Sequence, residues 1–144
     1  FRNYHLTLSF IGKTPLDELT QLEAVVKDAI VGVSPFALDI GDVVLFPPEQ
    51  EVKGLLIAEV AMDDALKSFQ ERIDAALRTA GYDIFVRVYN PHITIARLKK
   101  NRIYENELEQ DDLRFNSTVS HVHIYESHKK DGIVYNSIQR SVEL

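Results

Sequence analysis

Apolar and polar residues alternate at the start of the chain. In "YHLTLSF", residues 4–10, every second residue is apolar, from Tyr4 to Phe10. A period of two is typical of a half-buried strand, in which alternate side chains share one face. The pattern therefore predicts a strand on which His5 and Thr7 lie together on the polar face.

The same alternation returns late in the chain, in "PHITIARL", residues 91–98. It places His92 and Thr94 on one face of a second strand and Ile93 and Ile95 on the other. The two segments therefore share a His-x-Thr pattern inside an apolar alternating run.

Two long segments carry apolar residues at every third or fourth position, which predicts amphipathic helices over residues 14–30 and 63–81. Gly81 stands where the second helix should stop. The remaining apolar runs read as strands over residues 36–46, 53–61, 117–127 and 132–144, with a hairpin turn at 128–132.

The resulting order is strand, helix, strand, strand, helix, strand, strand, strand. Runs of strands mixed with helices in this way indicate an α+β fold. We expect two pseudo-symmetric lobes of antiparallel sheet backed by helices, with a central cleft that carries one His-x-Thr motif per lobe.

Composition narrows the class of protein. The chain of 144 residues has the size of one domain, and it contains no cysteine, which excludes disulfides and thiolate metal sites. A net charge of −6 argues against broad adhesion to nucleic acid, so that any phosphate site must be local. No apolar run approaches the roughly 20 residues that span a bilayer. We expect a monomer in the cytoplasm with no membrane contact.

The two motifs suggest acid–base chemistry on a phosphate. Side chains two positions apart on a strand lie about 6 to 7 Å apart on one face, so imidazole and hydroxyl can address one small group. Of two imidazoles, one can accept a proton while the other donates one. Threonine hydroxyls can donate to the phosphate oxygens without a metal. These residues predict His5 and His92 as catalytic groups, with Thr7 and Thr94 holding the phosphate.

The residues of both motifs match a known family. "HLTLSFIG", "PHITIAR" and the closing "HIYES…GIVYNSIQRSVEL" resemble the two-histidine (2H) phosphoesterases, specifically the RNA 2′,3′-cyclic phosphodiesterases also called 2′-5′ RNA ligases. The resemblance implies metal-independent opening of RNA 2′,3′-cyclic phosphate ends to a 2′-phosphate, and possible joining of RNA ends through a 2′-5′ bond. It implies no cofactor, and RNA ends or nucleotides with a cyclic phosphate as partners.

The resemblance also assigns Arg97, which matches the arginine that ends the second motif and would bind phosphate. Strict alternation places Arg97 on the face of Ile93 and Ile95, so a bulge or the end of the strand must turn it. For the acid–base pair we assign His92 as the base and His5 as the acid, and the residues leave the reverse assignment open. Family members usually have a strand and a helix before the first motif, so we expect a single 2H domain over 1–144 without them.

Two rival hypotheses remain at the level of sequence. "SHVHIYES" places His121 and His123 on one strand face, and a third ligand from His5 or His92 would make a histidine-ligated metal site. The second rival is a non-catalytic nucleotide-binding module that keeps the phosphate clamp.

Overall fold

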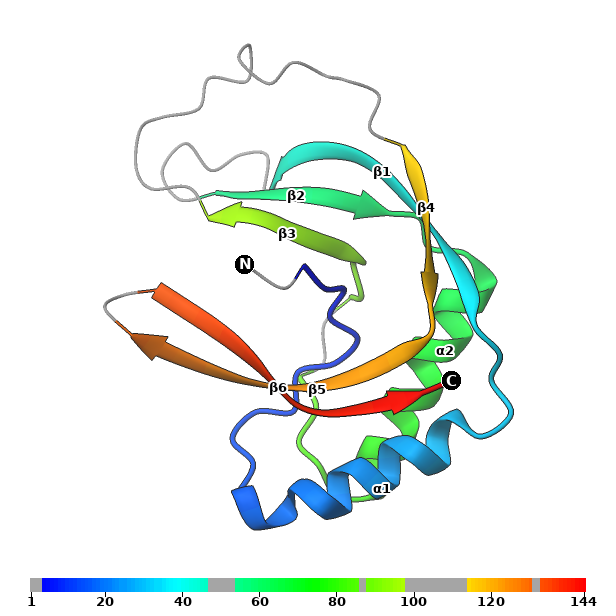
Figure 1. The fold of residues 1–144 in the computed structure, drawn as a ribbon, viewed down its shortest axis with the longest axis vertical. Coiled ribbons are helices and arrows are strands. Elements are labelled where there is room, and N and C mark those ends of the chain that lie inside the picture. Colours follow the sequence, from blue (N-terminus) through cyan, green and yellow to red (C-terminus); the bar gives the residue numbers. More distant parts are fainter. Residues whose placement is uncertain (1–3, 47–53, 86–87, 98–113, 131–132) are drawn as a thin grey trace. The chain divides into compact units, whose positions relative to one another are not determined.

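The structure is a computed structural model that describes residues 4–46, 54–85, 88–97, 114–130 and 133–144. Its elements follow the predicted order closely. In chain order they are a 3₁₀ turn η1 (Leu16–Glu18), α1 (Leu19–Ile30), β1 (Phe36–Phe46), β2 (Leu55–Val60), α2 (Asp64–Thr79), β3 (His92–Arg97), β4 (Phe115–Val119), β5 (His121–Lys130) and β6 (Ile133–Glu143). The predicted α+β class is confirmed, with antiparallel sheets and few helices (Figure 1).

The chain divides into two compact units. Unit 1 comprises Phe1–Thr7, Ala37–Asp63 and Val88–Ser117, and unit 2 comprises Leu8–Phe36, Asp64–Arg87 and Thr118–Leu144. Each unit is thus assembled from three separate stretches of the chain.

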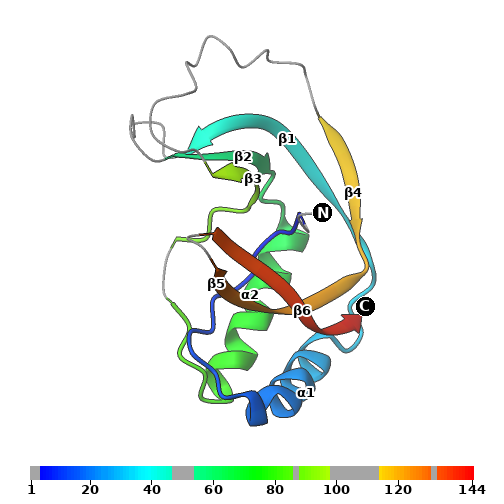
Figure 2. The same cartoon turned by 60° about the vertical axis from the view of Figure 1, so that its left-hand side comes forward.

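Unit 1 is built on a four-stranded sheet in the order β3-β2-β1-β4. Its strands β1, β2 and β3 are antiparallel neighbours, and β1 curves strongly along its length (Figures 1 and 2). Beyond β3, an antiparallel bridge joins Leu6 to Ile93. The first motif therefore lies directly beside the strand that carries the second.

Unit 2 packs its two helices against the ribbon formed by β5 and β6. Strand alternation points Val122, Ile124 and Val142 toward the helices, and all three are buried. They join one core with apolar residues of both helices, namely Leu22, Val26, Ala29, Ile30, Phe69, Ile73 and Leu77. Burial of this apolar stripe explains why both amphipathic segments fold as helices.

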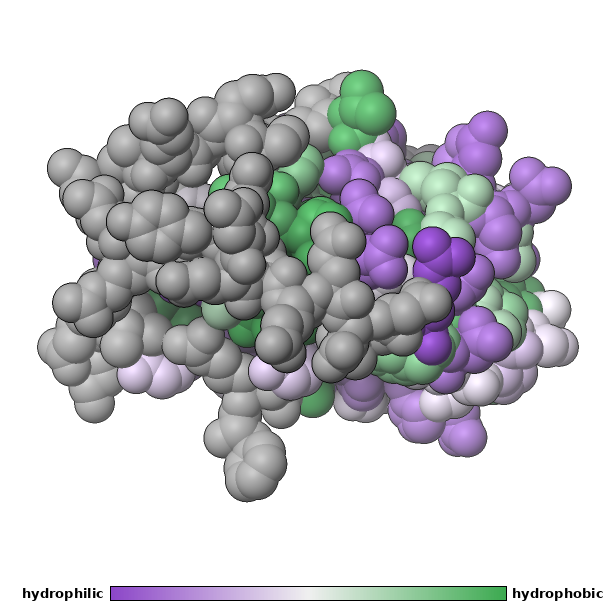
Figure 3. Space-filling view, turned by 90° about the horizontal axis from the view of Figure 1, so that it is seen from above, coloured by the Kyte–Doolittle hydropathy of each residue, from purple (hydrophilic) through white to green (hydrophobic). Residues whose placement is uncertain are grey.

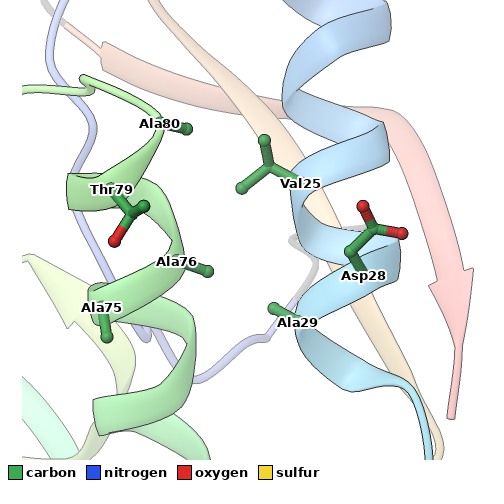
Figure 4. Close-up of a pocket in the computed structure, with 7 residues that line it drawn as sticks. All are labelled: Val25, Asp28, Ala29, Ala75, Ala76, Thr79 and Ala80. Atoms are coloured by element: carbon green, nitrogen blue, oxygen red, sulfur yellow. The ribbon is translucent and has the colours of Figure 1, made fainter.

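Mostly small residues line the space between the two helices. Figure 4 shows Val25 and Ala29 of α1 pointing toward Ala76 and Ala80 of α2, along a shallow groove. The second helix ends as predicted, because Gly81 adopts a φ of 91° and its amide donates to the carbonyl of Arg78.

Hydrogen bonds to α2 anchor the chain that follows the first motif. The Gln70 side-chain amide donates to the carbonyl of Leu8 at 3.4 Å, and the Ser9 hydroxyl donates to the Asp74 carboxylate. Both bonds lie within unit 2. They hold Leu8 and Ser9 against α2.

Three local expectations prove wrong. Residues 4–10 form one bridge, at Leu6, and not a continuous strand, because the carbonyl of Leu8 accepts a hydrogen bond from Gln70 of α2 and not from a neighbouring strand. Phe10, on the apolar face of that predicted strand, is 68% exposed. The single strand predicted over 117–127 breaks at Ser120 into β4 and β5, which belong to different sheets.

The expectation of one His-x-Thr motif per lobe also needs correction. Both motifs belong to unit 1, because the bridge between Leu6 and Ile93 joins the first motif to the strand of the second. Both helices belong to unit 2. The expected cleft between lobes stays a prediction.

Surface character is mixed. In Figure 3, hydrophilic and hydrophobic residues are interspersed over the described part of the face seen from above. In the described ranges, neither helix combines the length and the apolar character that crossing a membrane requires.

Candidate active site

The bridge between Leu6 and Ile93 brings the two motifs together. In an antiparallel pair, directly opposite residues point to the same face, so this register sets Thr7 beside His92 and His5 beside Thr94. All four side chains occupy the face opposite to Leu6 and Ile93. We call it the motif face, and its four motif residues are half-buried.

The two imidazoles are diagonal neighbours on the motif face. Diagonal neighbours across a strand pair lie about 7 to 8 Å apart. Thr7 and Thr94 lie on the other diagonal of the same face. The register therefore brings four polar side chains onto one face from two short segments that lie 87 residues apart in the sequence.

A β-bulge in β3 decides the position of Arg97. Opposite β2, Leu56 pairs with Ala96 but Ile57 pairs with Thr94, so Ile95 has no partner and is the extra residue. Beyond the bulge, Arg97 pairs with Leu55, which shares a face of β2 with Ile57.

Arg97 therefore belongs to the same face as Thr94. The guanidinium is exposed and sits at the end of the strand. The bulge thus turns Arg97 away from the face that strict alternation assigns to it. The guanidinium adds a fixed positive charge to the motif face.

The ring of His92 is held from two directions. Its Nδ1 lies 2.8 Å from the carbonyl oxygen of Asn90. Because a carbonyl only accepts, Nδ1 must carry the proton, and the basic lone pair of the neutral ring belongs to Nε2. The Phe46 ring stacks on the imidazole with centroids 5.9 Å apart and an interplanar angle of 23°.

Three residues beside His92 were not predicted from the sequence. Phe46 ends β1, Asn90 lies two residues before His92, and Glu59 pairs directly with His92 across the strands. The Asn90-Pro91 pair carries a signal in hindsight, since a residue before proline is held extended. Nothing in the sequence marks Phe46 or Glu59, because their place depends on the register between strands.

Replacing Phe46 tests whether stacking orients His92. Phe46→Leu should lower activity on a cyclic phosphate about two- to tenfold, because an aromatic pair contributes about 0.5 to 1.5 kcal/mol beyond burial. Phe46→Tyr keeps the ring and should retain activity. Steady-state kinetics with both variants checks this, and equal losses in the two would show that the ring stack is not the cause.

The other histidines of interest lie in unit 2. His121 and His123 follow one another on the same face of β5, with rings 5.9 Å apart and nearly parallel at 8°. Burial and the neighbouring His121 lower the pKa of His123. Among the described residues, no group of three or more histidine or acidic side chains could hold a metal ion. The rival metal site therefore has no third ligand in the described ranges.

A family model matches most of the chain. The model of the 2′-5′ RNA ligase superfamily aligns with residues 2–131, which include both His-x-Thr motifs and Arg97. The chain belongs to this superfamily. Membership in the 2′-5′ RNA ligase superfamily confirms the family that the motifs indicated.

Two curated relatives of the superfamily are named RNA 2′,3′-cyclic phosphodiesterase. The protein of Bacillus subtilis (strain 168) is 27% identical over 95 residues, which are 66% of this chain and 51% of the relative. The protein of Methanothermobacter thermautotrophicus is 29% identical over 100 residues, which are 69% of this chain and 53% of the relative. The alignments thus span about half the length of each relative.

Several solved structures share the fold of this chain. A protein of Thermus thermophilus superposes with a TM-score of 0.76 at 20% identity, covering 98% of this chain and 78% of the other. Escherichia coli LigT complexed with 3′-AMP gives a TM-score of 0.73 at 17% identity, covering 99% of this chain and 77% of LigT. At such identities the likeness establishes the fold alone.

Proposed function

We propose that this chain is a phosphodiesterase that opens 2′,3′-cyclic phosphate ends of RNA to a 2′-phosphate by paired-histidine acid–base catalysis. The observation that carries the proposal is the antiparallel bridge between Leu6 and Ile93, which sets both motifs on one face of unit 1. The names of the two curated relatives support the same activity.

The hydrolytic step needs one base and one acid. Nε2 of His92 takes a proton from water as the water oxygen attacks phosphorus, opposite the bond to the ribose O3′. That P–O3′ bond breaks, and His5 gives its proton to O3′. The product is a 2′-phosphate beside a free 3′-hydroxyl. With an RNA 5′-hydroxyl in place of water, the same step forms a 2′-5′ phosphodiester bond.

Charge that builds on the phosphate meets three donors. The hydroxyls of Thr7 and Thr94 lie on the other diagonal of the site and can donate to the non-bridging oxygens. Arg97 adds a permanent charge on the same face and can donate two parallel hydrogen bonds. Donors held in place before the reaction stabilise the transition state without a metal. We propose a metal-free, cytoplasmic monomer that acts on RNA ends or on nucleotides with a cyclic phosphate.

Turnover of a 2′,3′-cyclic nucleotide in excess EDTA tests the proposal. We expect hydrolysis at an undiminished rate, with the 2′-phosphate as the product resolved by chromatography. A 3′-phosphate product would contradict the assigned leaving group, and loss of activity in EDTA would favour the histidine-ligated metalloenzyme. Binding of the nucleotide by a folded chain without turnover would identify a non-catalytic module.

A further inference from the structure

The outer face of the β5–β6 ribbon carries an unusual set of side chains. Alternation along β5 sends Val122 and Ile124 into the core of unit 2, so the intervening residues point away from that core. These outward residues are His121, His123, Tyr125, Ser127 and Lys129. We call this row the histidine face. Apart from half-buried Tyr125, its members are exposed.

Successive rings on the histidine face contact one another. The imidazoles of His121 and His123 are parallel, and the ring of Tyr125 meets His123 edge-on at 6.0 Å. The centroids of the two imidazoles lie 5.9 Å apart, and each ring offers a flat aromatic surface of the kind on which bases stack. A flat base can therefore stack on each of these rings.

Serine hydroxyls fix the orientation of the two imidazoles. Nδ1 of His121 lies 2.9 Å from the Ser120 hydroxyl, and Nδ1 of His123 lies 2.7 Å from the Ser141 hydroxyl on β6. With Nδ1 engaged near the point of attachment, Nε2 is at the distal end of each ring. The rings are thus pre-oriented, which reduces the entropy lost when a ligand binds.

The two ends of the histidine face differ in charge. Lys129 is basic, whereas the ring of His123 is uncharged at neutral pH. The lowered pKa of His123, caused by burial and by His121, favours an uncharged ring at neutral pH. Uncharged rings stack with bases, whereas Lys129 offers an ammonium group to a phosphate. The only carboxylate that pairs with the described residues of this row is Glu143, which lies opposite His121 at the far end from Lys129.

We propose that the histidine face binds single-stranded RNA, with bases stacked on His121, His123 and Tyr125 and a backbone phosphate held by Lys129. Single-strand binding surfaces combine aromatic platforms with basic side chains in this way. The proposal rests on the function proposed above, because it names the RNA chain that leads to the cyclic phosphate end. It adds a binding surface outside the motif face.

Equilibrium binding of a fluorescent hexanucleotide RNA with a 3′-hydroxyl end tests the surface without any turnover. The double variant His121→Ala/His123→Ala should raise the dissociation constant at least about fivefold, as loss of base stacking predicts. The matched control is His128→Ala, which removes an imidazole from the other face of the same strand, where it stacks on Tyr135. The control should bind as the unchanged chain does.

The results of the binding and hydrolysis experiments test the RNA-binding face and the proposed function separately. An unchanged dissociation constant in the double variant, or an equal loss in the control, would overturn the RNA-binding face. A loss of RNA affinity in the double variant that is seen only when Zn²⁺ is present would overturn it in favour of a metal site. If a 2′,3′-cyclic mononucleotide is not hydrolysed but the double variant still loses RNA affinity, the proposed function fails and the binding face stands.

Discussion

Replacing His92 with alanine is expected to lower kcat/KM for a 2′,3′-cyclic nucleotide by about 10²- to 10⁴-fold, the usual contribution of a general acid or base. The same loss is expected for His5→Ala, because each ring supplies one of the two proton transfers. Both residues are half-buried on the edge of a sheet and make no part of the core of unit 2. We therefore expect circular dichroism spectra and unfolding midpoints close to those of the unchanged chain.

The control for the histidine variants is His128→Ala, because this ring lies on β5, outside unit 1. It should leave the hydrolysis of a mononucleotide unchanged. Full activity in either His5→Ala or His92→Ala, with the fold intact, would rule out paired-histidine catalysis.

Arg97→Ala should produce the second large effect, a loss of about 10²- to 10³-fold in kcat/KM, which is typical when one donor to a developing oxyanion is removed. The expectation depends on the bulge at Ile95, which moves Arg97 to the motif face. Arg97→Lys should recover part of the activity, because it keeps the charge but not the two parallel donors. Initial-rate kinetics at several substrate concentrations measures both variants.

Arg78 offers a matched control for Arg97. It is an arginine of α2 with a side chain 45% exposed, and its ion pair with Asp74 is long, at 3.9 Å. Arg78→Ala should leave kcat/KM unchanged. Equal activity of Arg97→Ala and Arg78→Ala would show that the bulge does not bring Arg97 to the reacting phosphate.

Much of the candidate site was predictable because it depends on strand periodicity. Alternation assigns His92 and Thr94 to one face from the sequence alone, and the structure keeps them there, opposite Ile57 and Glu59 on β2. That the two motifs come together was also expected, and the bridge between Leu6 and Ile93 brings them side by side. The pairing that joins them was not, since two strands in separate lobes and two neighbouring strands have the same local sequence pattern.

The features that could not be predicted from the sequence depend on pairing between distant strands. Ile95 is an ordinary strand residue by propensity, and only the register with β2 shows that it is the extra residue of a bulge. The break at Ser120 likewise depends on which sheet each half of the run joins, not on a turn residue. The side chains that surround His92, such as Phe46, follow from the same register and curvature.

We expect the two His-x-Thr segments to form one phosphate site, and a ligand titration tests this most directly. Imidazole resonances of the intact chain would be followed by NMR during addition of a 2′-mononucleotide, with His5 and His92 assigned from their alanine variants. We expect both sets of resonances to shift together with one dissociation constant. A response from only one of them, or two different dissociation constants, would contradict a shared site.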